Sequence, residues 1–80
     1  MSREARCVIL FASIHDVMAA EKNLRLRAVW YDLVPTPRQL SSDCGMALVV
    51  KAADLDAILP HLDGRRGVFQ RSGDDFVEIP

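Results

Sequence analysis

Residues 6–22 read RCVILFASIHDVMAAEK, and this stretch decides the fold of the chain. Its first part, residues 6–12, is apolar at nearly every position, which is typical of a β-strand covered on both faces. Ser13 then precedes apolar residues at helical spacing, and Asp16 follows three residues later. Ser-x-x-Asp is a shortened capping box, which marks the first turn of a helix. The pattern predicts a strand over 6–12 and a helix from Ser13 to about residues 25–27.

The rest of the chain also reads as strands and a helix separated by short connections. Composition and spacing predict strands over 28–34, 46–50, 67–71 and 76–79, a turn over 72–75 and a second helix over 52–62 with Pro60 bending its last turn. The order β-α-β-β-α-β with a C-terminal β-hairpin extension resembles the ferredoxin-like plan. That plan is an α+β two-layer sandwich with two helices on one face of an antiparallel sheet. A shuffled two-layer sandwich is the alternative if the loop over 35–45 carries a helical turn.

Length and composition limit the class of protein. The chain has 80 residues, and we expect residues 1–80 to form a single small domain. The formal charge is −1 without runs of one sign, which argues against nucleic acid and membrane surfaces as partners. Two cysteines cannot build a disulfide framework, so we expect a cytoplasmic setting. Half of the residues are apolar, which in so short a chain suggests a surface for a partner or a homodimer.

Cys44 lies in the polar loop PTPRQLSSDCG, residues 35–45, and is the candidate reactive residue. The prolines stiffen the start of this loop, and Arg38 carries a permanent charge on a planar donor group. Two serine hydroxyls and a glycine, which allows close backbone approach or a positive φ, complete it. A cysteine reacts as its thiolate, and a nearby cation lowers the thiol pKa. The expected site residues of the loop are Cys44 as the catalytic residue and Arg38, Ser41, Ser42 and Gly45 as binding residues.

Topology brings a second part of the chain to the same place. In the ferredoxin-like plan the first strand ends at the sheet edge where the loop between strands two and three lies. We therefore expect Cys44 to lie close to Ser13 and His15 at the start of the first helix, whose N-terminus would lower the thiol pKa. If residues 36–37 instead begin a short helix that ends just after Cys44, the partial charge of its C-terminus would raise that pKa.

At this loop the sequence resembles a known family. The string Pro-Thr-Pro-Arg-x-Leu-Ser-Ser-x-Cys-Gly is similar to the signature of small selenium/sulfur carrier-like proteins, a domain also found fused to TusA-like sulfur-carrier domains. Residues 10–22 resemble the family's first strand and helix, and the similarity runs from about residue 8 to residue 59. The resemblance implies that Cys44 carries a persulfide or selenopersulfide between donor and acceptor proteins, without a cofactor. The family usually has a glycine after its first helix, where residues 25–28 have none.

The remaining cysteine and histidine residues have plainer interpretations. Cys7 lies on an apolar strand and is predicted to be a packing thiol. His15 stands in the first turn of a helix, where a solvated side chain is the ordinary finding, and a role as a base or as a metal ligand together with Cys44 is the alternative. The cysteines and histidines show no ligand spacing, so no metal site is expected.

Two further classes of function stay open, and with them the question of whether the protein is an enzyme. The first is a non-catalytic interaction module. The strands over 6–12 and 46–50 are apolar on both faces, whereas two helices cover only one, so a partner or a second copy would cover the other. The second is a small redox or thiol-sensing protein that uses Cys44 alone.

Overall fold

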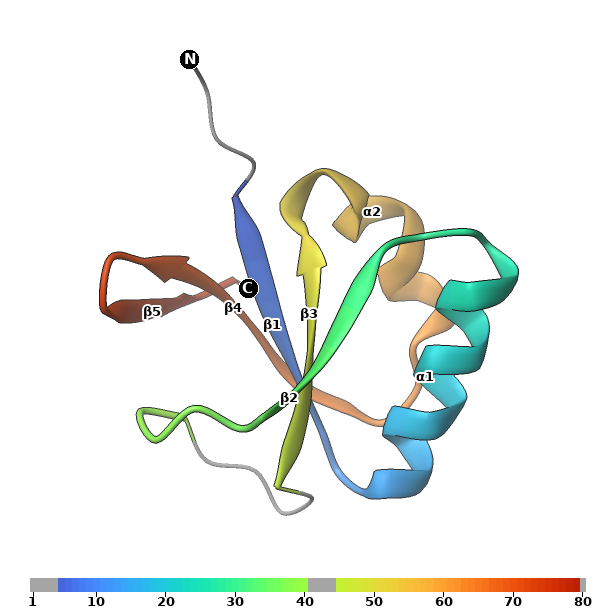
Figure 1. Ribbon diagram of the computed structural model, residues 1–80, viewed down its shortest axis with the longest axis horizontal. Coiled ribbons are helices and arrows are strands. Elements are labelled where there is room, and N and C mark those ends of the chain that lie inside the picture. Colours follow the sequence, from blue (N-terminus) through green and yellow to red (C-terminus); the bar gives the residue numbers. More distant parts are fainter. Residues whose placement is uncertain (1–4, 41–44, 80) are drawn as a thin grey trace.

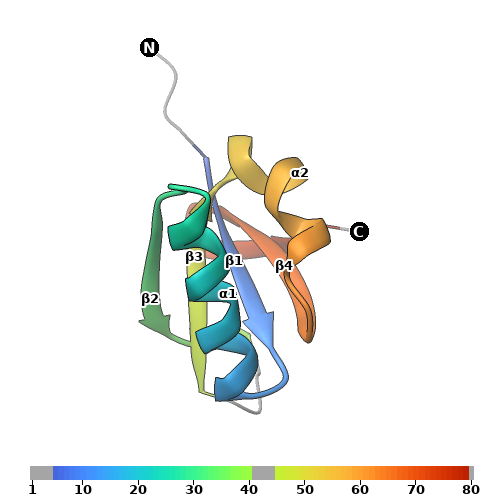
Figure 2. The ribbon, with the colours of Figure 1, turned by 90° about the vertical axis from the view of Figure 1, so that its right-hand side faces the viewer.

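The computed structural model of this chain describes residues 5–40 and 45–79. Its elements are β1 (Arg6–Phe11), α1 (Ile14–Leu26), β2 (Tyr31–Pro35), β3 (Met46–Lys51), η1 (Ala52–Asp54), α2 (Leu55–Ile58), η2 (Leu59–His61), β4 (Arg65–Ser72) and β5 (Asp75–Glu78). The strands form one antiparallel sheet of 5 strands in the order β2-β3-β1-β4-β5. Both helices lie on one side of it, and the turn end of the β4–β5 hairpin and residues 36–40 extend away from the helices on the other (Figure 1 and Figure 2).

The predicted combination of an antiparallel sheet with two helices is confirmed, and the predicted elements that differ most are the second strand and the second helix. β2 begins at Tyr31 rather than at residue 28, because the residues before it end α1 in a tight turn. The helix predicted over 52–62 is a broken helical run, in which the 3-10 helices η1 and η2 flank a short α2. Pro60 stands in η2, where it offers no N–H to an α-helical hydrogen bond.

β1 is the central strand of the sheet, since it pairs with β3 on one side and with β4 on the other. Its side chains alternate between the two faces. Cys7, Ile9 and Phe11 point to the helix side and are 0% exposed. They share one core with buried residues of the helical segments: Val17, Ala20, Leu24, Leu55, Ile58 and Leu62. Burial of a large apolar side chain contributes about 1.5–3 kcal/mol, so this core is the main source of stability.

The other face of the sheet has a smaller apolar cluster, formed by Val8, Leu10 and Ala47 and called the open-face cluster below. Its cover comes from the chain itself. Leu40 of the loop after β2 and two phenylalanines of the β4–β5 hairpin pack against it. Val8, Leu10 and Ala47 are at most 5% exposed. The expected uncovered apolar face is therefore partly covered within one molecule at this cluster.

α1 ends in a Schellman motif. The N–H of Val29 donates to the carbonyl of Leu24 at 2.9 Å, and the N–H of Ala28 donates to the carbonyl of Arg25 at 3.1 Å. The motif needs a left-handed residue, and Ala28 takes that conformation with a φ of 56°. A left-handed conformation costs a residue with a Cβ about 1–2 kcal/mol, a cost that glycine avoids. Ala28 thus lies within residues 25–28, the segment noted above for its missing glycine, and a glycine at this position would relieve the strain.

We predict that Ala28→Gly raises the free energy of unfolding by about 1 kcal/mol, because relief of the left-handed strain exceeds the added entropy of the unfolded chain. Urea denaturation of the two proteins measures the difference. The matched control is Ala19→Gly, an exposed position with ordinary geometry inside α1, which should lower stability by about 0.5–1 kcal/mol. A destabilising Ala28→Gly would contradict the assignment.

Candidate functional site

The loop that carries Cys44 is closed at its base by a backbone hydrogen bond. The N–H of Thr36 donates to the carbonyl of Gly45 at 3.0 Å, which continues the β2–β3 ladder beyond its last pair, Pro35 and Met46. Gly45 has a φ of +74°, and a Cβ added there would meet no atom of residues 5–40 and 45–79 within 4 Å. Of the two backbone roles expected for Gly45, the positive φ is the one observed, and conformation rather than space requires a glycine here.

The first half of the loop is a turn and not a helix. Over residues 37–40, the N–H of Leu40 donates to the carbonyl of Pro37 at 3.0 Å. Arg38 stands in this turn with its side chain exposed to solvent. The short helix considered as an alternative from residues 36–37 is absent from the part of the loop described, residues 36–40 and Gly45.

The same turn is attached to the C-terminal hairpin. The side-chain amide of Gln39 donates to the carbonyl of Asp74 at 3.1 Å. Leu40 next to it packs against the open-face cluster. The loop therefore leaves β2 and extends over the helix-free face, on the side of the sheet where the hairpin also lies (Figure 1).

Three of the predicted site residues, Ser41, Ser42 and Cys44, lie outside the described residues, so their roles stay predictions. The topological reason for placing Cys44 near α1 can nevertheless be followed in the strands. Leu10 pairs with Ala47, so the end of β1 and the start of β3 lie at the same end of the sheet. α1 begins at that end directly after β1 (Figure 1).

Ser13 and His15 stand at the start of α1. The hydroxyl of Ser13 accepts a hydrogen bond from the N–H of Asp16 at 3.3 Å and donates one to the carboxylate of Asp16 at 3.1 Å. The predicted capping role of Ser13 is thus confirmed, and its hydroxyl is engaged in holding the helix end. His15 is exposed.

The predicted site residues that the structure describes fall into two groups. The turn with Arg38 lies on the hairpin side of the sheet, whereas α1, which Ser13 caps, lies on the helix side (Figure 1 and Figure 2). Among the described residues, no hydrogen bond or ion pair joins Arg38 to Ser13 or His15. Arg38 and the pair Ser13 and His15 thus lie at the same end of the sheet, without a hydrogen bond or ion pair between them.

Thr36 adds a polar group that sequence reasoning did not single out. Its hydroxyl oxygen is buried and has no hydrogen-bond partner within the described part of the chain. An unsatisfied buried hydroxyl costs about 1–3 kcal/mol, so it is unusual in a stable domain. It lies at the base of the loop, beside the bond to Gly45.

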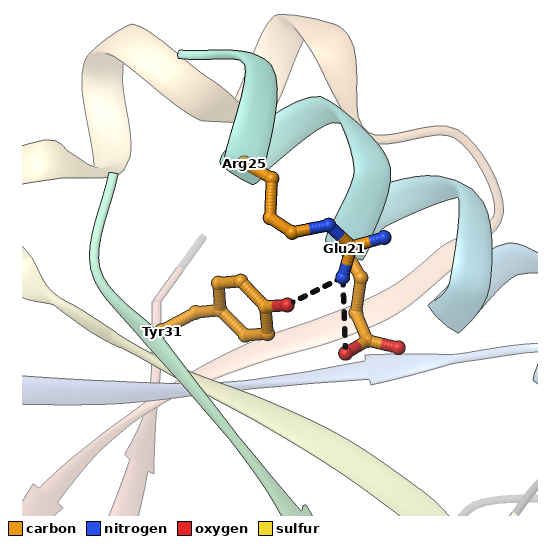
Figure 3. Close-up of polar contacts among 3 residues, drawn as sticks. All are labelled: Glu21, Arg25 and Tyr31. Carbon is orange, nitrogen blue, oxygen red and sulfur yellow. Dashed lines mark hydrogen bonds and ion pairs between the residues drawn. The ribbon is translucent and has the colours of Figure 1, made fainter. Parts of the chain in front are cut away.

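The edge strand β2 is fastened to α1 by a small polar cluster (Figure 3). Arg25 donates from its Nη1 to the hydroxyl of Tyr31 at 2.8 Å and lies 3.8 Å from the carboxylate of Glu21. The Tyr31 ring also packs against the main core. Exposed ion pairs of this kind contribute at most about 1 kcal/mol, so the cluster positions β2 more than it stabilises the domain.

Sequence reasoning missed a groove on the helix-free face. Its volume is about 700 Å3, and its lining includes Arg6, Asp32 and Arg71 from three different strands. The signal available in the sequence was the period of two along each strand. This period puts a charged residue on the same sheet face as the apolar residues two positions away from it. Such charges are also what an ordinary half-exposed strand shows, and only strand register brings these three together.

Cys7 is a packing residue, as predicted. It is 0% exposed on the helix side of β1, and loss of water around the thiol raises its pKa above the ordinary value. Among the described residues there is no group of three or more His, Cys, Asp or Glu arranged to hold a metal ion. A helix long and apolar enough to cross a membrane is likewise absent from residues 5–40 and 45–79.

Comparison with known proteins places the loop in a family. The model of the family described as "Putative Se/S carrier protein-like" matches residues 6–68, from β1 into β4 and across the whole of the Cys44 loop. The chain belongs to this family. The family match ends inside β4, so the turn and strand that complete the C-terminal hairpin lie beyond it. Neither a search of curated proteins nor a search of solved structures found a significant match.

Gly64 holds the start of α1 against the loop before β4. Its carbonyl accepts a hydrogen bond from the N–H of Ala12 at 2.9 Å, and its φ is +76°. A Cβ on Gly64 would overlap the carboxylate of Asp16, which partners the Ser13 cap. Gly64 therefore needs both the left-handed conformation and the missing side chain.

We predict that Gly64→Ala is more destabilising than Gly45→Ala. Both variants carry left-handed strain of about 1–2 kcal/mol, and Gly64→Ala must in addition displace Asp16, which adds at least about 1 kcal/mol. The two glycines share nearly the same φ and differ in their surroundings, so each is the control for the other. Urea denaturation measures both, and equal losses of stability would contradict the close contact with Asp16.

We also predict that Cys7 does not react with iodoacetamide at pH 8 in the folded protein, because its thiol is buried and its raised pKa keeps it protonated. In guanidinium chloride it should react at the rate of an ordinary thiol. Peptide mass spectrometry measures the modified fraction in both states. Rapid modification under native conditions would show that β1 opens far more readily than its burial indicates.

Proposed function

We propose that this protein carries sulfur or selenium as a persulfide or selenopersulfide on Cys44. The observation that supports the proposal is the family match over residues 6–68, which includes the loop with Cys44. The chain has 2 cysteines, and the other one, Cys7, is fully buried and unsuited to meet a partner protein. The cargo position therefore falls to Cys44.

The proposed loading step is a thiol–persulfide exchange. The thiolate of Cys44 attacks the outer sulfur of a persulfide on a donor protein, a new S–S bond forms on Cys44, and the donor's S–S bond breaks. The donor leaves as a thiolate, and Cys44 becomes a persulfide. A thiolate on the acceptor protein repeats the attack in the unloading step. Each step exchanges one S–S bond for another, so it needs no oxidant and no cofactor.

The described part of the loop suits this chemistry. The bond between Thr36 and Gly45 fixes both ends of the loop, and the turn over 37–40 presents Arg38 to solvent. A guanidinium near Cys44 would favour its thiolate and the anionic persulfide. The remaining members of the proposed setting are Ser41, Ser42 and Gly45 in the loop and Ser13 and His15 at the start of α1.

The fold and the partners complete the proposal. The sheet order β2-β3-β1-β4 supports a ferredoxin-like plan for the first four strands and the two helices, with β5 as an added edge strand. The partners are sulfur or selenium donor and acceptor proteins, and the setting is the reducing cytoplasm. A carrier of this kind transfers a group between proteins and acts alone on no small substrate.

A second candidate is a non-catalytic interaction module. Three exposed apolar side chains favour it, namely Ile14 at 44%, Met18 at 59% and Leu33 at 39%. Ile14 and Met18 are four residues apart on α1, on the side that also carries Glu21 and Arg25 and faces β2. An apolar surface beside the edge strand suits a protein partner, whether the partner delivers sulfur or only binds.

We predict that Cys44 gains the mass of one sulfur atom when the protein is incubated with a cysteine desulfurase and cysteine, because its thiolate competes for the enzyme's persulfide. Peptide mass spectrometry under non-reducing conditions locates the gain, and dithiothreitol should remove it. The matched control is Cys44→Ser, which retains Cys7 and should gain nothing.

An unloaded Cys44 in a reaction without reductant would overturn the carrier proposal, provided that a parallel reaction shows the desulfurase to release sulfide to dithiothreitol. The same Cys44→Ser variant separates the two candidates. If it retains binding to a partner and all measurable function, the interaction module replaces the carrier.

A further inference from the structure

The groove on the helix-free face is a candidate binding site that does not involve Cys44. Its volume of about 700 Å3 lies within the range of about 300–1,000 Å3 common for small-molecule sites. Val8 and Val49 come from the two central strands and form its floor. β2 and Pro37 lie on one side of this floor, and the β4–β5 hairpin lies on the other.

Basic side chains stand side by side at one end of this groove. Arg6 pairs with Lys51 across β1 and β3. The neighbouring pair, Cys7 with Gln70, sets a register that places Arg6 beside Arg71 across β1 and β4. Residues opposite each other on antiparallel strands project from the same face, and like charges there repel each other. Both arginines line the groove, the guanidinium of Arg6 next to the Trp30 ring and that of Arg71 at the β4–β5 turn.

Neither arginine makes an ion pair within the described part of the chain. Arg71 donates from its Nε to the carbonyl of Gly73 at 3.0 Å, which is a neutral acceptor. The guanidinium of Arg6 lies 4.4 Å from the centre of the Trp30 ring. The ion pair of Glu21 with Arg25 is on the opposite side of the sheet and involves neither of them. Two cations without a carboxylate partner, at the end of a concave site, favour an anion.

The rest of the lining determines what kind of anion fits. Val8, Val34 and Val49 with Phe76 give the groove apolar walls, which suit an aliphatic or aromatic body. Asp32 also lines the groove and pairs with Val49, so it lies one row away from the arginines. Its carboxylate repels a second acidic group. The lining therefore matches a single acidic group at one end of an apolar molecule.

We infer that the groove binds a small organic anion, with its acidic group on Arg6 and Arg71 and its apolar body over Val8, Val49 and Phe76. The size of the groove favours a small molecule over an extended acidic peptide. Arg71 and Phe76 lie beyond the part of the chain that the family model matches, so the site belongs to this chain and its C-terminal hairpin.

The test uses 1-anilinonaphthalene-8-sulfonate, an aromatic sulfonate whose fluorescence rises when it leaves water. The full chain should bind it with an affinity that falls as salt is added. Arg71→Gln should weaken binding about tenfold, the effect of losing one charge-assisted hydrogen bond. Arg71→Lys, which retains the charge, should restore most of it. Benzoate should displace the probe, and acetate, which lacks an apolar body, should not.

Two control variants locate the probe. Lys22→Gln removes one positive charge from the exposed surface of α1, and Met18→Gln removes an exposed apolar side chain of the same helix. Neither should change binding of the probe. If Arg71→Gln binds like the wild type, or if Met18→Gln loses the probe, the groove is not the site. Should Arg71→Gln fail to fold, as judged by urea denaturation, Arg6→Gln makes the same test.

Two further measurements distinguish this small-molecule site from a site for an acidic protein partner and from the carrier function of Cys44. Displacement of the probe by hexaglutamate at a lower concentration than benzoate would assign the groove to an acidic protein partner and overturn the small-molecule inference. Cys44→Ser should bind the probe like the wild type. A chain that binds the probe but never loads sulfur on Cys44 would therefore retain this site and lose the carrier function.

Discussion

The burial of both faces of β1 is the constraint on which the rest of the structure depends. Cys7, Ile9 and Phe11 support the helices, while Val8 and Leu10 support the loop and the hairpin. A slip of one residue against β3 or β4 would exchange the two sets and break both clusters at once. The same register puts the end of β1 beside the start of β3, so it also determines where the Cys44 loop returns to the sheet.

Much of the fold could be predicted because its signals are local. The apolar run over 6–12, the Ser13 cap and the bend at Pro60 each act through neighbouring residues. The start of β2 was misplaced since Ala28 takes a left-handed conformation that its own type disfavours, and only the Schellman bonds to α1 require it. The cover of the open-face cluster depends on a contact between a loop and a hairpin that are distant in sequence, which no local pattern announces.

The candidate site divides in the same way. The family was recognisable from the loop and the first helix, and its match over residues 6–68 confirms it. The positive φ of Gly45 was foreseen from its residue type. The groove was missed because Arg6 and Arg71 are neighbours only through the strand register, and along the chain each is one charge among others. Ser13 shows the converse, since a hydroxyl proposed for the site is engaged in capping α1.

The short outer strand β5 has a consequence for how this apolar chain behaves at high concentration. A sheet edge offers free backbone groups to other molecules, and a long flat edge invites aggregation. β5 has only 4 residues, with Asp75 at one end and Glu78 at the other. Antiparallel pairing of two such strands in full register would set Asp75 of one molecule opposite Glu78 of the next, where like charges repel. At the opposite edge, Pro35 ends β2 without an N–H to offer. The hairpin that partly covers the open face thus also guards the sheet against stacking edge to edge with its own copies.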